Sequence, residues 1–320
     1  KEAFTDTILY TPPYIGGVIE TQTNYNSQRI STADFGAKCD GVTDDRAAIQ
    51  AAGDAAIAAR KPLYIQESVN GCRVTKNPSG DYALLWQAPI QLQGTSGRSI
   101  ILPDLAMPSN VNIIYLIGQN GNTYTPTVIN GIFIGNPSSG TRSGSHAIVF
   151  DTLNVNQLFQ RPQITNNYLQ TPLSSNGSSI YAINSETNNP TGGFTYALIE
   201  NNLIGSGISL NKSGDSITIR KNTFFNGGTN NPGVYGNLVN GTGGQAGNLV
   251  ITQNNMAMAG GQVVIDCGQN PVISWNEMEQ DITSVEANSA QIDIKGSACQ
   301  VTGAKVFMNQ MQSLTVAGTP

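Results

Sequence analysis

Six asparagines occupy one position of a pattern that repeats through the second half of the chain, and this column constrains the fold more than any other feature. Each asparagine stands in the pattern apolar-x-x-Asn-x-apolar, as in ITNNYL (164–169), and an apolar strand such as IVFD (148–151) precedes each pattern. The first strands of the six couplets end at 151, 184, 211, 240, 266 and 295, so one repeat takes 26 to 33 residues. The asparagines are Asn167, Asn202, Asn222, Asn254, Asn276 and Asn309.

Three apolar columns accompany the asparagines when the couplets are aligned, and they predict a solenoid. Coils of parallel strands stack about 4.8 Å apart, so like residues lie above one another and form a continuous core. The two apolar columns that flank each asparagine are five positions apart, an odd spacing that requires the chain to bend at the asparagine. Stacked amides at this bend can hydrogen-bond from coil to coil. The columns are Phe150, Ile183, Leu210, Val239, Ile265, Ile294; then Ile164, Ile199, Ile219, Ile251, Ile273, Val306; then Leu169, Ile204, Phe224, Met256, Met278, Met311.

Composition supports an all-β fold and excludes several classes of function. Only 12% of the residues are charged, about half the usual share of roughly 25%, and glycine is abundant, which disfavours a helical protein. The net charge of -5, without a run of Lys or Arg, argues against nucleic-acid binding. No apolar stretch approaches the roughly 20 residues of a membrane span.

The sequence divides into three parts. Residues 1–30 are expected to form an extended neck or linker, residues 31–145 an N-terminal capping segment with early irregular coils, and residues 146–320 the regular coils. Within the second part, Thr43 is a natural helix N-cap, and Asp44 and Asp45 fall in the expected first turn, where the helix dipole favours anions. We therefore interpret these two acids as structural rather than as a catalytic pair.

A resemblance to a known family adds to this interpretation. The segment DFGAKCDGVTDDRAAIQAA (34–52), followed by PLYI (62–65), resembles the opening of the pectate-lyase-like β-helix superfamily, most closely that of bacteriophage tailspike depolymerases. It departs from the family at Cys39, where glycine is usual, and in QESVNGCRVT (66–75). The resemblance implies a single-stranded right-handed parallel β-helix with an N-terminal capping α-helix, assembled as a homotrimer. The chain begins at Lys1 rather than Met, and we expect a missing N-terminal part to join other virion tail proteins.

The preferred candidate site lies on an outward column two positions before the asparagines, composed of Thr165, Glu200, Arg220, Thr252, Ser274 and Phe307. Glycoside hydrolysis uses two carboxylates, one as acid and the other as base or nucleophile. Glu200, Asp215 and Glu186 are the candidate catalytic residues here, with Arg220 and Tyr196 as candidate substrate ligands. Asp215 is expected to lie near Glu200 across one coil. The alternative for Glu200 and Arg220 is a surface ion pair.

A second candidate site lies in the fifth coil. Asp266 and Glu277 are its candidate catalytic residues, and Trp275 is a possible platform for sugar stacking. The structural alternatives are a ladder contact between Asp266 and Lys295 and packing of Trp275 at the corner of the coil.

Other chemistries are disfavoured. His146 is the only histidine, which argues against a histidine triad or a histidine-rich metal site. The NTD, GHG and RIK motifs expected of polygalacturonases are absent, as is a clustered aspartate set for calcium. We predict no cofactor and no metal. The widely spaced Cys39, Cys72, Cys267 and Cys299 favour thiols, with Cys39 and Cys72 as the one pair to test for a disulfide.

The predicted function is that of a phage tailspike in the virion tail, which recognises and degrades bacterial capsule or O-antigen, by hydrolysis rather than by a lyase reaction. Two alternatives stay open at this point: a non-catalytic glycan-binding fibre, and a secreted microbial polysaccharide lyase or hydrolase that acts as a monomer.

Overall fold

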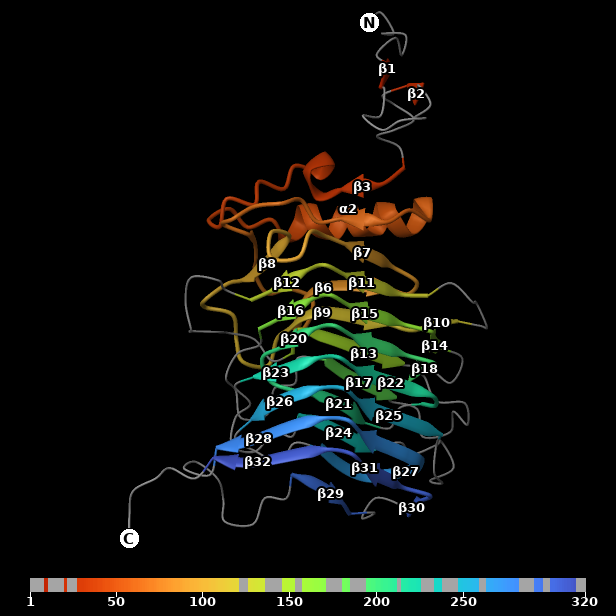
Figure 1. The fold of residues 1–320 in the computed structure, drawn as a ribbon. Helices are drawn as coiled ribbons and strands as arrows, with labels where there is room; N and C mark the ends of the chain where they lie inside the picture. Colours follow the sequence, from red (N-terminus) through yellow and green to blue (C-terminus); the bar gives the residue numbers. More distant parts are fainter. Residues whose placement is uncertain are drawn as a thin grey trace, which may run out of the picture.

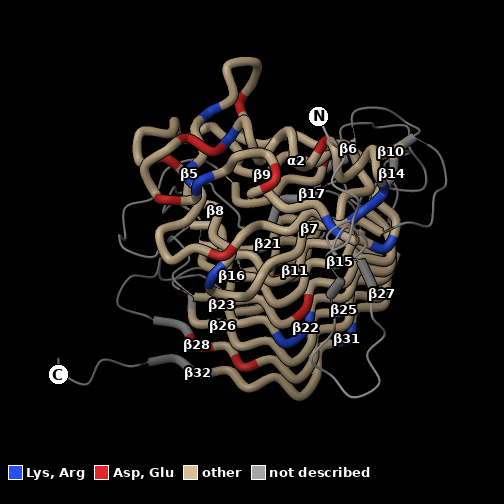
Figure 2. Tube along the Cα trace, turned by 90° about the horizontal axis from the view of Figure 1, so that it is seen from above, with Lys and Arg blue, Asp and Glu red and all other residues tan. Residues whose placement is uncertain are grey.

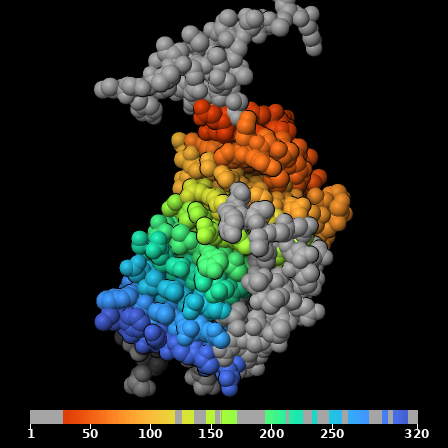
Figure 3. Space-filling view, turned by 90° about the vertical axis from the view of Figure 1, so that its right-hand side faces the viewer, coloured from red at the N-terminus to blue at the C-terminus, as the bar shows by residue number. Residues whose placement is uncertain are grey.

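The computed structural model describes residues 9–10, 20–21, 28–120, 126–135, 146–152, 157–170, 180–184, 194–211, 214–225, 233–237, 247–258, 263–281, 291–295 and 300–314. It confirms the predicted fold, a right-handed parallel β-helix with an N-terminal capping helix (Figure 1). The chain winds in one direction, so its colours run in order from the capped end to the opposite end (Figure 3).

Three parallel sheets form the wall of the helix, and the regular coils contribute a strand to each sheet. Sheet 1 contains β6 (Tyr82–Gln87), β9 (Asn112–Ile117), β13 (Ile148–Thr152), β17 (Ile180–Asn184), β21 (Ile208–Asn211), β24 (Val234–Asn237), the first part of β27 (Val263–Ser274) and β29 (Ile292–Ile294).

Sheet 2 follows sheet 1 in each coil, and the two sheets are continuous through β27. It contains β3 (Ile30–Ser31), β4 (Leu63–Tyr64), β7 (Gln91–Gln93), β11 (Val128–Asn130), β15 (Gln163–Thr165), β19 (Leu198–Glu200), β22 (Ile217–Arg220), β25 (Asn248–Thr252), the second part of β27, β30 (Val301–Thr302) and β31 (Lys305–Phe307).

Sheet 3 closes each coil and has nine strands. They are β5 (Cys72–Val74), β8 (Ile100–Pro103), β12 (Phe133–Ile134), β16 (Tyr168–Leu169), β20 (Leu203–Ile204), β23 (Thr223–Phe225), β26 (Asn255–Met258), β28 (Glu277–Asp281) and β32 (Gln310–Leu314). A small sheet of β10 (Gln119–Asn120), β14 (Gln157–Gln160) and β18 (Phe194–Thr195) adjoins these three and packs Phe159 and Phe194 against Phe150 of the core. Separately, β1 (Leu9–Tyr10) pairs with β2 (Glu20–Thr21).

The core consists of stacked apolar columns, and two of the three predicted columns are confirmed in register. Their last members, Val306 and Met311, are 45% and 49% exposed at the end opposite the cap, so the buried core ends one coil earlier. Ile164 pairs in register with Ile199, and Leu169 pairs with Ile204, as the alignment requires.

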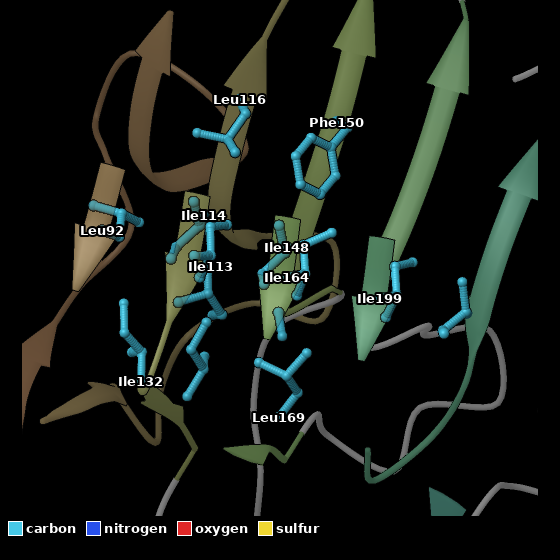
Figure 4. Packing of buried hydrophobic residues seen from close by; sticks show 14 of the residues in the cluster. Leu92, Ile113, Ile114, Leu116, Ile132, Ile148, Phe150, Ile164, Leu169 and Ile199 are labelled. Carbon is cyan, nitrogen blue, oxygen red and sulfur yellow. The ribbon is translucent and has the colours of Figure 1, made fainter. Parts of the chain in front are cut away.

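Leu92, labelled in Figure 4, and Ile129 continue the Ile164 column into earlier coils, so the core runs past the predicted repeat. Ile132 is level with Asn167 and fills the place of an asparagine.

The third predicted column, in sheet 1, is wrong at two of its six members. Ala182, rather than Ile183, lies opposite Phe150 and Leu210. Gly236 pairs with Ile265 in the place assigned to Val239, which lies outside the described residues. A Cβ atom at Gly236 would lie 3.0 Å from Leu249 and 3.1 Å from Ile265, so neighbouring side chains fill the space that glycine leaves. Because glycine has no apolar side chain, the sequence pattern did not mark Gly236 as a core position. The prediction assigned the next apolar position, Val239, in its place.

The predicted asparagine ladder is confirmed between sheets 2 and 3. Asn222 is 1% exposed, and its Oδ1 accepts from the backbone N–H and from Nδ2 of Asn202. Its Nδ2 donates to Oδ1 of Asn254 and to the carbonyl of Ile199 in the preceding coil. The same contacts recur along the column to Asn309. The bend comes from the preceding residue, which has a positive φ in every coil, for example 58° at Trp275.

The helix α2 (Arg46–Ala59) caps the open edge of the solenoid above β6 and β7, after the short 3-10 helix η1 (Thr32–Phe35) (Figure 1). Nε2 of Gln50 donates to the carbonyl of Leu85, and the backbone N–H of Leu85 donates to Oε1 of Gln50. These bonds pair backbone groups that would otherwise be open at the edge strand of sheet 1. Gly53 lies against the buried Trp86 ring, and a Cβ atom at Gly53 would lie 2.2 Å from Nε1 of that ring.

The expected N-cap is wrong, because Asp45 rather than Thr43 precedes the helix, and Asp44 and Asp45 therefore lie before its first turn rather than in it. The buried Asp45 carboxylate accepts from the backbone N–H groups of Lys38 and Cys39, and Asp44 accepts from Thr75. Both acids therefore have structural partners, as interpreted from the sequence.

The cysteines also differ from the favoured thiols. Cys39 and Cys72 form a disulfide, and Cys267 is disulfide-bonded as well. No helix in the described part of the chain is long and apolar enough to cross a membrane.

Candidate functional site

A polar column runs along the outer face of sheet 2, parallel to the solenoid axis, as the sequence predicts. Glu200 lies in register between Thr165 and Arg220. Hydrogen bonds link neighbours in the column, from Asn130 to Thr165 at 2.7 Å and between Thr252 and Ser274 at 3.2 Å. We call this column, together with the exposed corner residues that follow it, the outer strip. Its corner residues are Asn166, Asn201, Lys221, Gln253, Trp275 and Met308.

Glu200 is the centre of charge in the outer strip. Nη2 of Arg220 donates to Oε2 at 3.1 Å, while Nε of Arg220 and Nζ of Lys221 lie 3.0 and 3.3 Å from Oε1. Figure 2 shows the acidic and basic segments side by side at β22. The predicted surface ion pair is therefore present, and Lys221 adds a second cation to it.

These partners determine the protonation of Glu200. Burial raises the pKa of Glu200, but hydrogen bonds and charges from Arg220 and Lys221 outweigh burial and hold that pKa below its usual value. Glu200 is therefore ionised at neutral pH. An ionised carboxylate suits a base or a nucleophile, whereas a general acid has to carry a proton.

Asp215 lies at the other end of the same pair of strands. Its carbonyl accepts from the backbone N–H of Tyr196, so it neighbours Tyr196 rather than Glu200. Tyr196 and Glu200 are four residues apart, with the corner at Tyr196, so at most about 13 Å of extended chain separates them. The carboxylate of Asp215 accepts from Ser216 and from the N–H of Asn248. The Asp215 carboxylate is therefore held at the corner beside Tyr196, and none of its hydrogen bonds within the described residues reaches Glu200.

The remaining members of the preferred site lie apart or outside the described residues. Tyr196 is exposed at the corner between sheets 1 and 2, where its φ is 54°. Glu186 lies outside the described residues.

In the fifth coil, the candidate residues lie on different faces. Asp266 is the extra residue of a bulge in β27, because Ile265 and Cys267 pair with the consecutive Gly236 and Asn237. Its carboxylate accepts from the Tyr235 hydroxyl at 3.2 Å. Glu277 is exposed on sheet 3, beyond the corner that carries Trp275.

The predicted ladder of Asp266 with Lys295 has the expected register, because Ile265 pairs with Ile294 and the two charged residues follow that pair. The ion pair that Lys295 forms is nevertheless with Asp293, at 3.4 Å. Toward the preceding coil the bulge takes Asp266 out of the pairing, and Cys267 pairs with Asn237 instead. Trp275 does not pack into the corner, since 59% of it is exposed. It stands at the edge of the outer strip and is open to a ligand.

Sequence reasoning missed a tyrosine–aspartate pair on the outer face of sheet 1. The Tyr115 hydroxyl donates to the buried Asp151 carboxylate on the neighbouring strand. Burial and this hydrogen bond raise the pKa of Tyr115. Extending the alignment one coil earlier, to place NIIYLIG beside AIVFDT, would have put the two residues on adjacent strands.

One group of side chains has the composition of a metal site, at Cys39, Asp45 and Cys72. The disulfide occupies both sulfurs, and the Asp45 oxygens accept two backbone N–H groups. This group therefore stabilises the capped end and does not offer free metal ligands.

Comparisons with known proteins support the fold. No family model and no curated protein sequence matches the chain. Among solved structures, the A-module of the mannuronan C-5 epimerase AlgE6 of Azotobacter vinelandii is similar, with a TM-score of 0.54 and 15% identity, over 87% of this chain and 79% of that one. A tailspike protein variant of E. coli bacteriophage HK620, in complex with a hexasaccharide, has a TM-score of 0.50 and 16% identity. The match covers 96% of this chain but only 61% of that tailspike.

The fold places the chain among parallel β-helix proteins. At these identities the likeness concerns the fold, and function has to be argued from the residues of this chain.

Proposed function

We propose that this chain is the body of a phage tailspike that binds bacterial capsule or O-antigen and cuts it by glycosidic hydrolysis. The outer strip is the observation that carries the proposal. It presents hydroxyl, amide and ion-paired groups about 4.8 Å apart along the axis, a spacing comparable to the length of one sugar unit. Trp275 offers an exposed aromatic ring at the edge of the strip, suited to stacking on the apolar face of a sugar.

Within this proposal, Glu200 is the ionised carboxylate that acts as base or nucleophile. Arg220 and Lys221 hold it in place, and Arg220 also contacts the substrate. The second carboxylate is sought among Glu186, Asp215, Asp266 and Glu277. Asp215 lies in the coil next to Glu200, whereas Asp266 and Glu277 belong to the fifth coil, three coils further along the axis. Tyr196 is a further substrate ligand. The homotrimer, the virion-tail location and the contact with other tail proteins belong to the same proposal and are supported by the tailspike-like fold.

A non-catalytic glycan-binding fibre is the second candidate. The observation that favours it is the double ion pair of Glu200, since a carboxylate neutralised by two cations has less tendency to attack a sugar. In this case the outer strip binds polysaccharide without changing it.

The test is incubation of the chain with purified bacterial surface polysaccharides, followed by assays of new reducing ends and of ultraviolet absorbance. Hydrolysis gives reducing ends without an unsaturated product, a lyase gives both, and a binder gives neither. Glu200→Gln should abolish cleavage with folding intact, whereas Glu67→Gln, the same change in the cap region, should leave it unchanged. Full cleavage by the Glu200→Gln variant would remove Glu200 from the mechanism. Trp275→Ala should weaken polysaccharide binding about tenfold, within the range of a lost stacking contact.

A further inference from the structure

A separate cavity of about 480 Å³ lies at the capped end, far along the axis from Trp275. It is bounded by the end of α2, by the turn that leads into β7 and by β10. This volume falls within the range of small-molecule sites. In Figure 1 these elements meet on the side of the molecule that carries β10 and β14.

The charged groups of this cavity are all cations. Arg60 and Lys61 line it, and no acid does so among the described residues. Neither side chain has an ion pair or hydrogen bond within the described ranges, in a protein of net charge -5. Cations at a helix C-terminus are ordinarily explained by the dipole. Here the backbone N–H groups of both residues already cap the last carbonyls, those of Ile57 and Ala56, so the side-chain charges stay available.

A buried amide gives an independent sign of a ligand. Gln119 is only 9% exposed and lines the cavity, yet its side chain has no hydrogen-bond partner in the described part of the chain. The Gln119 amide is open to the cavity rather than sealed inside the protein, so its donor and acceptor are free for a polar group bound there. Ile57, Pro89 and Ile90 supply an apolar wall beside it.

We propose that this cavity binds an acidic sugar through its carboxylate, as a glycan site separate from the outer strip. The carboxylate lies on Arg60 and Lys61, a ring hydroxyl bonds to Gln119, and the apolar face of the ring lies on Ile57 and Ile90. The choice of a sugar as the ligand rests on the proposed function. The choice of a carboxylate rests on the two cations.

The test is titration of the intact chain with glucuronic acid, N-acetylneuraminic acid and glucose, followed by saturation-transfer NMR. An acidic sugar should bind at least tenfold more tightly than glucose. Arg60→Gln and Lys61→Gln, which keep the length of the side chain, should each reduce this affinity at least tenfold, and Gln119→Glu should abolish binding by repulsion. Lys305→Gln, at an exposed lysine near the opposite end, is the matched control and should change nothing.

Acidic sugars that bind no more tightly than glucose would overturn the inference, and so would unchanged binding by the Arg60→Gln, Lys61→Gln double variant. Tighter binding of glucose 6-phosphate would overturn the assignment of a carboxylate. The wild-type comparison of acidic and neutral sugars remains decisive if a variant fails to fold. Acidic-sugar binding that persists in Trp275→Ala supports a separate site. If the chain neither binds nor cuts polysaccharide but does bind acidic sugars at this cavity, the proposed function is wrong and the inference of an acidic-sugar site is upheld.

Discussion

Replacing Asn222 with alanine tests whether the asparagine ladder stabilises the solenoid. The side chain makes five hydrogen bonds in the structure, two accepted from Asn202 and three donated, to Asn254, Ile199 and Arg220. Alanine leaves the buried N–H of Asn202 without its partner, which costs about 1–3 kcal/mol. The other bonds contribute about 1 kcal/mol each, but several of their partners retain a second contact. We therefore expect the free energy of unfolding to fall by about 3–5 kcal/mol.

Two further asparagines provide matched comparisons in urea denaturation followed by circular dichroism. Asn309 ends the ladder and is half-buried, so Asn309→Ala should cost about 1 kcal/mol. Asn255 is exposed on sheet 3, and Asn255→Ala should change stability by less than about 0.5 kcal/mol. Equal losses for Asn222→Ala and Asn255→Ala would refute the argument that the ladder holds the corner.

Three other predictions concern the cap, the disulfide and pH. Gly53→Ala should lower the unfolding free energy by about 1–3 kcal/mol, since its Cβ would overlap the Trp86 ring; an unchanged melting temperature would show that the ring can move. The Cys39→Ser, Cys72→Ser double variant opens a loop with a sequence separation of 33 and should lose about 3–4 kcal/mol in urea denaturation, a value that a loss below about 1 kcal/mol would contradict. The lowered pKa of Glu200 contributes stability above the unfolded-state pKa of about 4.3 that disappears as pH falls through the folded value. The stability difference between wild type and Glu200→Gln should therefore shrink in acid, and a difference independent of pH would contradict the ion-paired state.

The sequence predicted the parts of the fold that repeat with a fixed local spacing. Asn222 and its flanking residues Ile219 and Phe224 lie within one short segment, so no variable loop separates them and their columns align correctly. Sheet 1 is joined to this segment by loops of different length. The sequence alignment therefore placed Ile183 and Val239 in the sheet 1 column in error.

For the site too, contacts between residues of the same repeated segment were predictable, and contacts that depend on loops or bulges were not. The pairing of Glu200 with Arg220 was predictable because both occupy the same column. Asp215 was misplaced because a corner with Ser216 at positive φ separates it from the strand. The bulge at Asp266, the hydrogen bond of Tyr115 to Asp151 and the cavity beside Gln119 depend on contacts between coils, and spacing along one segment does not reveal them.

The most direct test of the proposed glycan site is the structure of Glu200→Gln bound to an oligosaccharide from a polysaccharide that the wild-type chain cuts. We predict that the sugar lies along the outer strip, with one ring stacked on Trp275 and a glycosidic oxygen within hydrogen-bonding reach of residue 200. Sugar bound on the outer face of sheet 1 or on sheet 3, with the outer strip empty, would contradict the account.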